Sequence, residues 1–205
     1  MEIQKTQYIH KIGDYFKSNG IRAISMDRIS KMLNISKKTL YKHFKDKNDI
    51  VCTLMNFQCK SEKYIFKQIT NKADNAIEET FNFSRFVTQN FKDVNPIIFS
   101  DIENYHPDAL KIMNNHKRVD IYNIIKSNME RGIKEELYRS DFNIDILSKI
   151  YSEKIEILYD TVLFPDRKYT FREKYEEMMM YHLHGIVSEK GLEYIRNRNT
   201  NKNNK

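Results

Sequence analysis

Glycine and proline are scarce in this sequence, which has 5 glycines and 3 prolines among 205 residues. Alternation of apolar and polar residues bounded by turn residues, which is typical of strands, is hard to find. Apolar residues instead recur at helical spacing along most of the chain. We therefore expect an all-α protein.

Long apolar runs and catalytic motifs are missing as well. There is no run of about 18 apolar residues, and polar residues interrupt any signal-peptide pattern at the start. The sequence contains no P-loop, no GxGxxG and no Ser-His-Asp arrangement. His182 and His184 would point about 200° apart on a helix, so they cannot share a metal. We expect a soluble cytoplasmic protein that is not an enzyme and has no membrane segment, metal or cofactor.

The two cysteines do not favour a disulfide. Cys52 and Cys59 stand seven positions apart, which on a helix separates them by roughly 10 Å along the axis, farther than a disulfide spans. We interpret them as two small buried residues in a reducing compartment. A redox sensor working through one thiol per subunit is the alternative.

The net positive charge is confined to the first quarter of the chain. Residues 1–48 contain 11 Lys and Arg against 4 Asp and Glu, whereas residues 49–205 contain 24 of each. Clustered basic residues on one small domain are typical of proteins that bind phosphates. A basic surface that merely faces water is the alternative, but the helical pattern in the same stretch favours DNA.

Residues 25–50 predict two short helices joined by a tight turn and followed by a third. Ser25 is suited to cap the first helix, whose buried face carries Met26, Ile29, Met32 and Leu33.

The turn and the second helix complete the pattern. Asn34 tolerates a left-handed turn conformation, Ile35 would anchor the turn, and Ser36 can cap the second helix. Leu40 and Phe44 would face inward from that helix. This is the pattern of a helix-turn-helix, which places its second helix in the DNA major groove.

Residues 8–55 closely resemble the N-terminal DNA-binding domain of TetR-type (TetR/AcrR) transcriptional regulators. The most specific match is the string TLYKHF from Thr39 to Phe44, followed by Lys47. Residues 130–139 and 181–186 resemble one branch of that family more weakly. Where the family usually has Ala and Gly, this chain has Ser30, Asn34 and Lys38, so its base preference is its own.

The resemblance implies a homodimer that binds a palindromic double-stranded operator, acts as a repressor, and is released by a small, largely apolar effector. It also implies residues that face bases or phosphates: Met26, Asp27, Ser36, Lys37, Lys38, Thr39, Tyr41, Lys42, His43 and Lys47. Lysines donate to phosphate or guanine, and a threonine methyl can touch a thymine methyl. The ring of Tyr41 could instead pack on the small domain.

The expected domains are a helix-turn-helix domain at 1–48, a helical effector-binding and dimerisation domain at 49–195, and a disordered tail at 196–205. Helices are expected at 47–71, 75–91, 96–105, 107–131, from 143 to before Pro165, and at 170–187. The tail contains Asn, Lys and Arg but no core residues.

Two further sites are expected in the second domain. On the family analogy, the last two long helices form the dimer interface, with surplus apolar surface at Tyr151, Ile155, Leu158, Val162, Tyr175, Met178, Met179, Leu183 and Ile186. Abundant aromatic and Met side chains favour an apolar effector cavity, with candidates Phe57, Phe86, Phe99, Tyr105, His116 and Tyr122. These six could equally be ordinary core residues.

Two other functions remain open from the sequence. One is a nonspecific architectural DNA-binding protein that uses the basic N-terminal region without regulation. The other is a regulator switched by a protein partner or a thiol in place of a small molecule.

Overall fold

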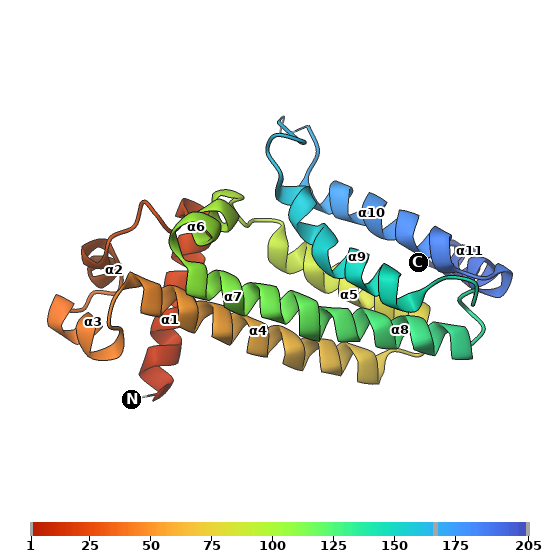
Figure 1. Cartoon of the computed structure of the whole chain (residues 1–205), viewed down its shortest axis with the longest axis horizontal. Helices are drawn as coiled ribbons and strands as arrows, with labels where there is room; N and C mark the ends of the chain where they lie inside the picture. The colour runs from red at the N-terminus through yellow and green to blue at the C-terminus, as the bar shows by residue number, and fades with distance from the viewer. Residues whose placement is uncertain (1, 166–167, 204–205) are drawn as a thin grey trace. The chain divides into compact units, whose positions relative to one another are not determined.

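The computed structural model describes residues 2–165 and 168–203, and within these ranges the chain forms helices and no β-strand (Figure 1). The helices are α1 (Glu2–Asn19), α2 (Met26–Met32), α3 (Lys37–His43), α4 (Lys47–Lys72), α5 (Ala76–Phe91), α6 (Ile97–Tyr105), α7 (Pro107–Asn115), the π-helix η1 (His116–Ile121), α8 (Tyr122–Lys134), α9 (Ile144–Glu153), the 3₁₀-helix η2 (Lys154–Tyr159), α10 (Phe171–Ile186) and α11 (Glu189–Asn203). The all-α expectation is confirmed.

The first compact unit comprises Met1–Lys63 and Asp93–His116. Its core joins the inward faces of α1 to α4 with those of α6 and α7. The buried side chains are Ile9, Ile12, Phe16, Ile21, Ile24, Ile29, Leu33, Leu40, Phe44, Ile50, Val51, Ile98, Ile102 and Ala109. The boundary expected at residue 48 therefore falls inside this unit, because α6 and α7 contribute to the same core.

The second compact unit comprises Tyr64–Lys92 and Lys117–Lys205. Here α8 packs against α9 and α5, and α5 also packs against α10. Buried residues of α5, α10, α11 and the segment after α8 form its core: Ala76, Ile77, Leu137, Tyr138, Met179, Leu183, Ile186 and Ile195.

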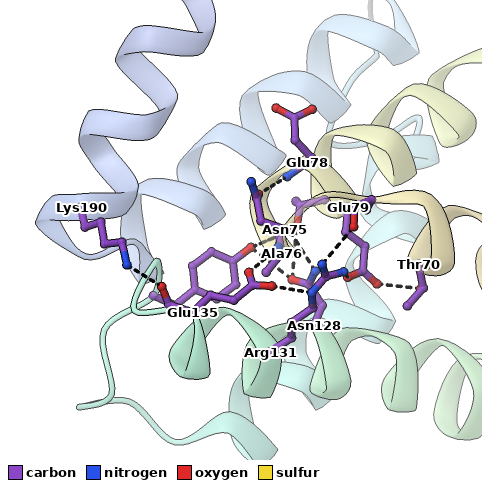
Figure 2. Close-up of polar contacts among 12 residues, drawn as sticks. Thr70, Asn75, Ala76, Glu78, Glu79, Asn128, Arg131, Glu135 and Lys190 are labelled. Carbon is purple, nitrogen blue, oxygen red and sulfur yellow. Dashed lines mark hydrogen bonds and ion pairs between the residues drawn. The ribbon is translucent and has the colours of Figure 1, made fainter.

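A network of charged side chains ties the turn between α4 and α5 to α8 (Figure 2). The Arg131 guanidinium donates to Glu79 at 3.2 Å, to Glu135 at 2.7 Å and to the carbonyl of Ala73 at 2.9 Å. Glu79 is 2% exposed, whereas the Arg131 side chain is 29% exposed, so it is the carboxylate that is buried. Removing one member would leave an uncompensated buried charge.

The same network caps the first turn of α5. Glu135 accepts from the backbone nitrogen of Ala76 at 2.8 Å, while Asn128 donates to the Ala76 carbonyl at 2.9 Å. Tyr138 also donates to that carbonyl, at 3.1 Å. The contact from Glu135 satisfies an N–H group that a helix start otherwise leaves without a partner.

The helix expected at 107–131 runs to Lys134 but contains the π-helical stretch η1. A π turn accommodates an additional residue and shifts the faces that follow it. Its first two residues are both buried beside carboxylates: His116 Nε2 lies 3.1 Å from Glu62 within the first unit, and Lys117 contacts Glu153 and Glu156 within the second.

The expectation of a disordered tail at 196–205 is wrong for residues 196–203, which form the second half of α11; residues 204–205 lie outside the described ones. Arg198 pairs with Glu78 at 2.5 Å and lies 3.8 Å from the centre of the Phe81 ring. Ile195 is buried just before it. A charged anchor therefore replaces the apolar anchor that the tail lacks.

Replacing Gly132 by alanine is expected to lower the free energy of unfolding by about 1–3 kcal/mol. A Cβ atom there would lie 2.0 Å from Cδ2 of Tyr138, whose side chain is buried. Urea denaturation of both variants measures the change. Gly185→Ala is the matched control, because a Cβ at that helical glycine meets no atom within 4 Å. Equal stability of the two variants would contradict the close packing of Gly132 on Tyr138.

Candidate nucleic-acid interface

Both short helices of the helix-turn-helix begin with the serine caps that the sequence predicts. The Ser25 hydroxyl accepts from the backbone nitrogen of Arg28 at 3.2 Å, and the Ser36 hydroxyl accepts from that of Thr39 at 3.0 Å. Asn34 has φ +54°, the left-handed conformation expected of the turn. The local geometry of residues 25–43 is thus confirmed.

One face of α3 is buried and the other is open. Leu40 and Phe44 are 0% and 1% exposed. Tyr41 is 52% exposed, so most of its ring faces solvent rather than the core. The remaining predicted DNA contacts divide by exposure: Asp27, Ser36, Lys37, Lys38 and Lys42 are exposed, while Met26, Thr39, His43 and Lys47 are half-buried.

Side chains of α1 pack against His43 and Phe44 at the end of α3. The Tyr8 and His43 rings meet edge to face with centroids 5.3 Å apart, and the Lys5 ammonium lies 5.0 Å from the centre of the Phe44 ring. His43 is therefore a packing residue as well as a candidate phosphate contact.

Arg28 is a basic residue of this surface that sequence reasoning missed. Its Nε donates to the hydroxyl of Tyr15 at 2.6 Å, which holds the guanidinium between α2 and α1. Its position three residues after the predicted cap and its positive charge were the available signals. An arginine held in this way is suited to contact a DNA phosphate.

The loop between α1 and α2 is held by two oppositely charged side chains. The Asp101 carboxylate on α6 accepts from the backbone nitrogens of Ile21 at 2.7 Å and Arg22 at 2.8 Å. From α4, Lys47 Nζ donates to the carbonyls of Ile21, Arg22 and Ile24 at 3.1–3.3 Å.

These contacts give Lys47 a structural role that differs from the predicted phosphate contact. Burial lowers the pKa of Lys47, and the nearby Asp101 carboxylate opposes that shift. The ammonium would have to leave three backbone carbonyls to reach DNA. Its role in this structure is to fix the loop that leads into α2.

Gly20 is required where this loop begins. It has φ +78°, and a Cβ there would lie 2.8 Å from Cγ2 of Ile97 and 3.2 Å from a carboxylate oxygen of Asp101. Both the backbone conformation and the close approach of α6 therefore favour glycine.

The six predicted effector residues are divided between the two units. Phe57, Phe99, Tyr105 and His116 belong to the first unit, and Phe86 and Tyr122 to the second. Three have polar partners that the sequence did not reveal: Tyr105 lies under Arg22, His116 contacts Glu62, and Tyr122 donates to Asp145 at 2.7 Å.

The second unit contains an aromatic group around the predicted Phe86. The Phe66 ring lies edge to face with both Phe83 and Phe86, at 5.3 Å between centroids in each case. Phe66 was not predicted, because the sequence pattern of a long amphipathic helix does not show which aromatic rings of another helix a given residue contacts.

Four predicted dimer-interface residues are buried within the single chain. Leu158, Met179, Leu183 and Ile186 are 0–7% exposed and belong to the chain's own core. Tyr151, Ile155, Tyr175 and Met178 are half-buried, and Val162 is 88% exposed. An apolar stripe on an amphipathic helix faces its own core before any partner, and these four residues follow that rule.

A different set of apolar side chains is exposed on α9, η2 and α10. Ile146, Ile150 and Ile157 are 44–53% exposed, and Tyr181 on α10 is 78% exposed. Beside them His182 contacts the Tyr151 ring, with centroids 3.5 Å apart. Burial, with a smaller effect of Lys154, lowers the pKa of His182 to about 4, so its ring is neutral at physiological pH.

Cys52 lacks the environment of a reactive thiol. Burial raises its pKa, and the carboxylates of Asp108, Asp49 and Asp46 raise it further. A raised pKa keeps the sulfur protonated and unreactive. Within the described part of the chain, no group of three or more His, Cys, Asp or Glu is placed to hold a metal, and no helix is long and apolar enough to cross a membrane.

Replacing Asp101 by alanine is expected to lower the free energy of unfolding by about 2–4 kcal/mol, because it leaves two backbone N–H groups without their acceptor. Chemical denaturation measures the loss. Glu103→Ala removes the same charge from an exposed site of α6 and should change stability by about 0.5 kcal/mol or less. Similar effects of the two variants would show that Asp101 does not hold the loop.

Comparison with known proteins points to one family. Residues 14–52 match the family described as bacterial regulatory proteins, tetR family. The HTH-type transcriptional regulator SAB2452 of Staphylococcus aureus is 40% identical over 68 residues, which are 33% of this chain and 37% of that protein. The chain thus matches little more than a third of that relative's length.

Solved structures extend the likeness to nearly the whole chain. A TetR-family regulator from Agrobacterium tumefaciens has a TM-score of 0.74 and 13% identity, over 91% of this chain and 99% of that one. A regulator from Saccharomonospora viridis, solved in complex with choline, has a TM-score of 0.73 and 18% identity, over 92% and 100%. These likenesses show the fold. With the helix-turn-helix geometry, the matched segment shows that residues 14–52 carry the N-terminal segment of the tetR family, and the whole chain shares the fold of solved regulators of that family.

Proposed function

We propose that this protein is a transcriptional repressor that binds a palindromic operator as a homodimer and releases it on binding a small effector. The observation that carries the proposal is the open face of α3, where Lys37, Lys38, Tyr41 and Lys42 are exposed while Leu40 and Phe44 fix the helix to the core. This face lies within the segment that matches the family's DNA-binding domain. A helix held in this way is suited to enter the major groove.

The charge distribution supports DNA as the partner. Arg28 and the exposed lysines of α3 lie on helices of one small module, and residues 1–48 carry nearly three times as many basic as acidic residues. Lysine and arginine contacts to phosphates release counterions, so affinity should fall steeply as salt rises.

The direct experiment is selection of bound duplexes from a random DNA pool at physiological salt, followed by sequencing. A two-fold symmetric motif with half-sites about 34–36 Å apart is expected, since a dimer presents two copies of α3 to successive turns of DNA. Binding without an enriched motif would favour the architectural DNA-binding protein and contradict the regulator.

Dimerisation through α9, η2 and α10 is supported by the apolar residues that the single chain leaves exposed. Ile146, Ile150 and Ile157 would be covered together with Tyr181. Exposed apolar patches of this kind mark protein–protein contacts, and two-fold symmetry would bring the same patch from each subunit together.

Aromatic side chains of the second unit support a small-molecule effector. The edge-to-face group of Phe66, Phe83 and Phe86 offers aromatic surface in the second unit, and one solved protein with this fold is a choline complex. Aromatic faces bind both apolar molecules and quaternary ammonium groups. A ligand that prefers another arrangement of the protein would lower its affinity for the operator.

The effector class is tested with the selected operator as a fluorescent probe. Alkyl chains of increasing length and a matching series of quaternary ammonium compounds are titrated into the protein–DNA complex. Release by either series identifies the class, and release by neither favours a regulator switched by a partner. The raised pKa of the Cys52 thiol gives the thiol-switched alternative no support from that residue.

Lys42→Ala is expected to weaken operator binding and to reduce the slope of log affinity against log salt by about 1, the value for loss of one phosphate contact. Fluorescence anisotropy at several salt concentrations provides both quantities. Lys67→Ala, which removes an exposed lysine of α4 in the second unit, should change neither. Equal salt slopes for both variants would exclude Lys42 as a phosphate contact.

Tyr181→Arg is expected to convert dimers to monomers at micromolar concentration, because it places a charge in the apolar contact between subunits. Sedimentation velocity gives the dissociation constant. Tyr64 is 67% exposed on α4, so Tyr64→Arg is a matched control that should leave the dimer intact. An intact Tyr181→Arg dimer would place the interface elsewhere.

A further inference from the structure

An acidic residue stands on the surface proposed to face DNA, in contact with a lysine of α3. Lys37 Nζ lies 2.5 Å from Oδ2 of Asp27 in α2, and the two side chains are 59% and 55% exposed. They come from different helices of the helix-turn-helix, ten positions apart in the sequence. Both are therefore open to the same approaching partner.

Stability alone gives little reason for this pair. An exposed ion pair contributes little to stability and often nothing measurable. A carboxylate on this surface also repels the phosphates of DNA. Asp27 thus opposes general affinity for DNA, and a useful role for it must come from discrimination between sequences.

The major groove offers a target that matches a lysine and an aspartate in contact. A G·C pair displays two adjacent acceptors, guanine N7 and O6, beside one donor, the amino group of cytosine. Lysine donates to the guanine acceptors, and a carboxylate accepts from cytosine N4. Guanine O6 and cytosine N4 are hydrogen-bonded neighbours, so the two protein groups that read them must also be close together.

An A·T pair matches less well. Its central groove group is the adenine amino donor, which separates the N7 and O4 acceptors. An ammonium that approaches either acceptor therefore lacks the second adjacent acceptor that guanine provides. The lysine–aspartate pair should favour G·C over A·T.

We propose that Asp27 and Lys37 act as one unit that reads a single G·C base pair in each operator half-site. The inference rests on the proposed function, since it assigns a base preference to the same surface. Asp27 contributes specificity at the expense of general affinity. Lys37 contacts a base, whereas other lysines contact phosphates.

The test compares the motifs selected by the wild type, Asp27→Ala, Lys37→Met and the double variant. In the wild type, one symmetric position should be G·C, and changing it to A·T should weaken binding about 10-fold or more. Each single variant should reduce this ratio to near 1 at that same position. The double variant should lose no more discrimination than either single variant, because the two groups form one reading unit.

Asp141→Ala is the matched control, because it breaks another short exposed pair, that of Arg139 and Asp141 at 2.6 Å, in the second unit. It should leave the motif unchanged. Thermal melting confirms that the variants fold, as expected for exposed residues.

Each remaining outcome has a defined meaning. If no variant, including the wild type, selects a motif, the proposed function itself fails. A motif that persists unchanged in Asp27→Ala, even with tighter binding to all DNA, overturns the inference alone, because the acid then acts only by repulsion. Loss of preference at two different positions in the two single variants would also overturn it.

Discussion

Backbone N–H and C=O groups beyond the ends of helices must find hydrogen-bond partners outside the helix. In this chain, charged side chains from distant helices provide these partners. In the first unit Asp101 accepts from two N–H groups of the loop before α2, while Lys47 donates to three of its carbonyls. In the second unit Glu135 and Arg131 do the same for the turn between α4 and α5. Each turn is thus fixed by both a carboxylate and a cation.

This arrangement determines where the open face of α3 points. The loop held by Asp101 and Lys47 leads directly into α2, and α2 packs against α3. The caps at Ser25 and Ser36 fix where the two helices begin, and the left-handed Asn34 fixes the turn between them. A side chain such as Lys37 has flexible torsions, but the backbone that carries it has few alternatives.

The sequence predicted the parts of the site that depend on near neighbours. Serine caps, a left-handed asparagine and an apolar residue every three or four positions each act within one turn of helix, so they can be recognised locally. Asp101 could not be found in this way, because it lies 80 positions from the backbone that it contacts.

The burial of four interface candidates and the helical tail could not be predicted, for related reasons. Helical periodicity shows that Leu183 faces something apolar, but it does not distinguish the chain's own core from a second subunit. The tail lacks apolar residues, and its anchor is the ion pair between Arg198 and a glutamate 120 positions earlier. The side chains that recognise each other across such separations leave no periodic signal.

Because Asp101 fixes the loop before α2, it limits which segments of this protein can be exchanged with those of similar proteins. The segment that matches the family's DNA-binding domain ends at residue 52, whereas the carboxylate that fixes its first loop lies on α6. A chimaera that joined residues 1–52 to the rest of a similar protein would keep α3 but lose this support. The module that can be exchanged intact therefore includes α6, although α6 lies in a different part of the sequence.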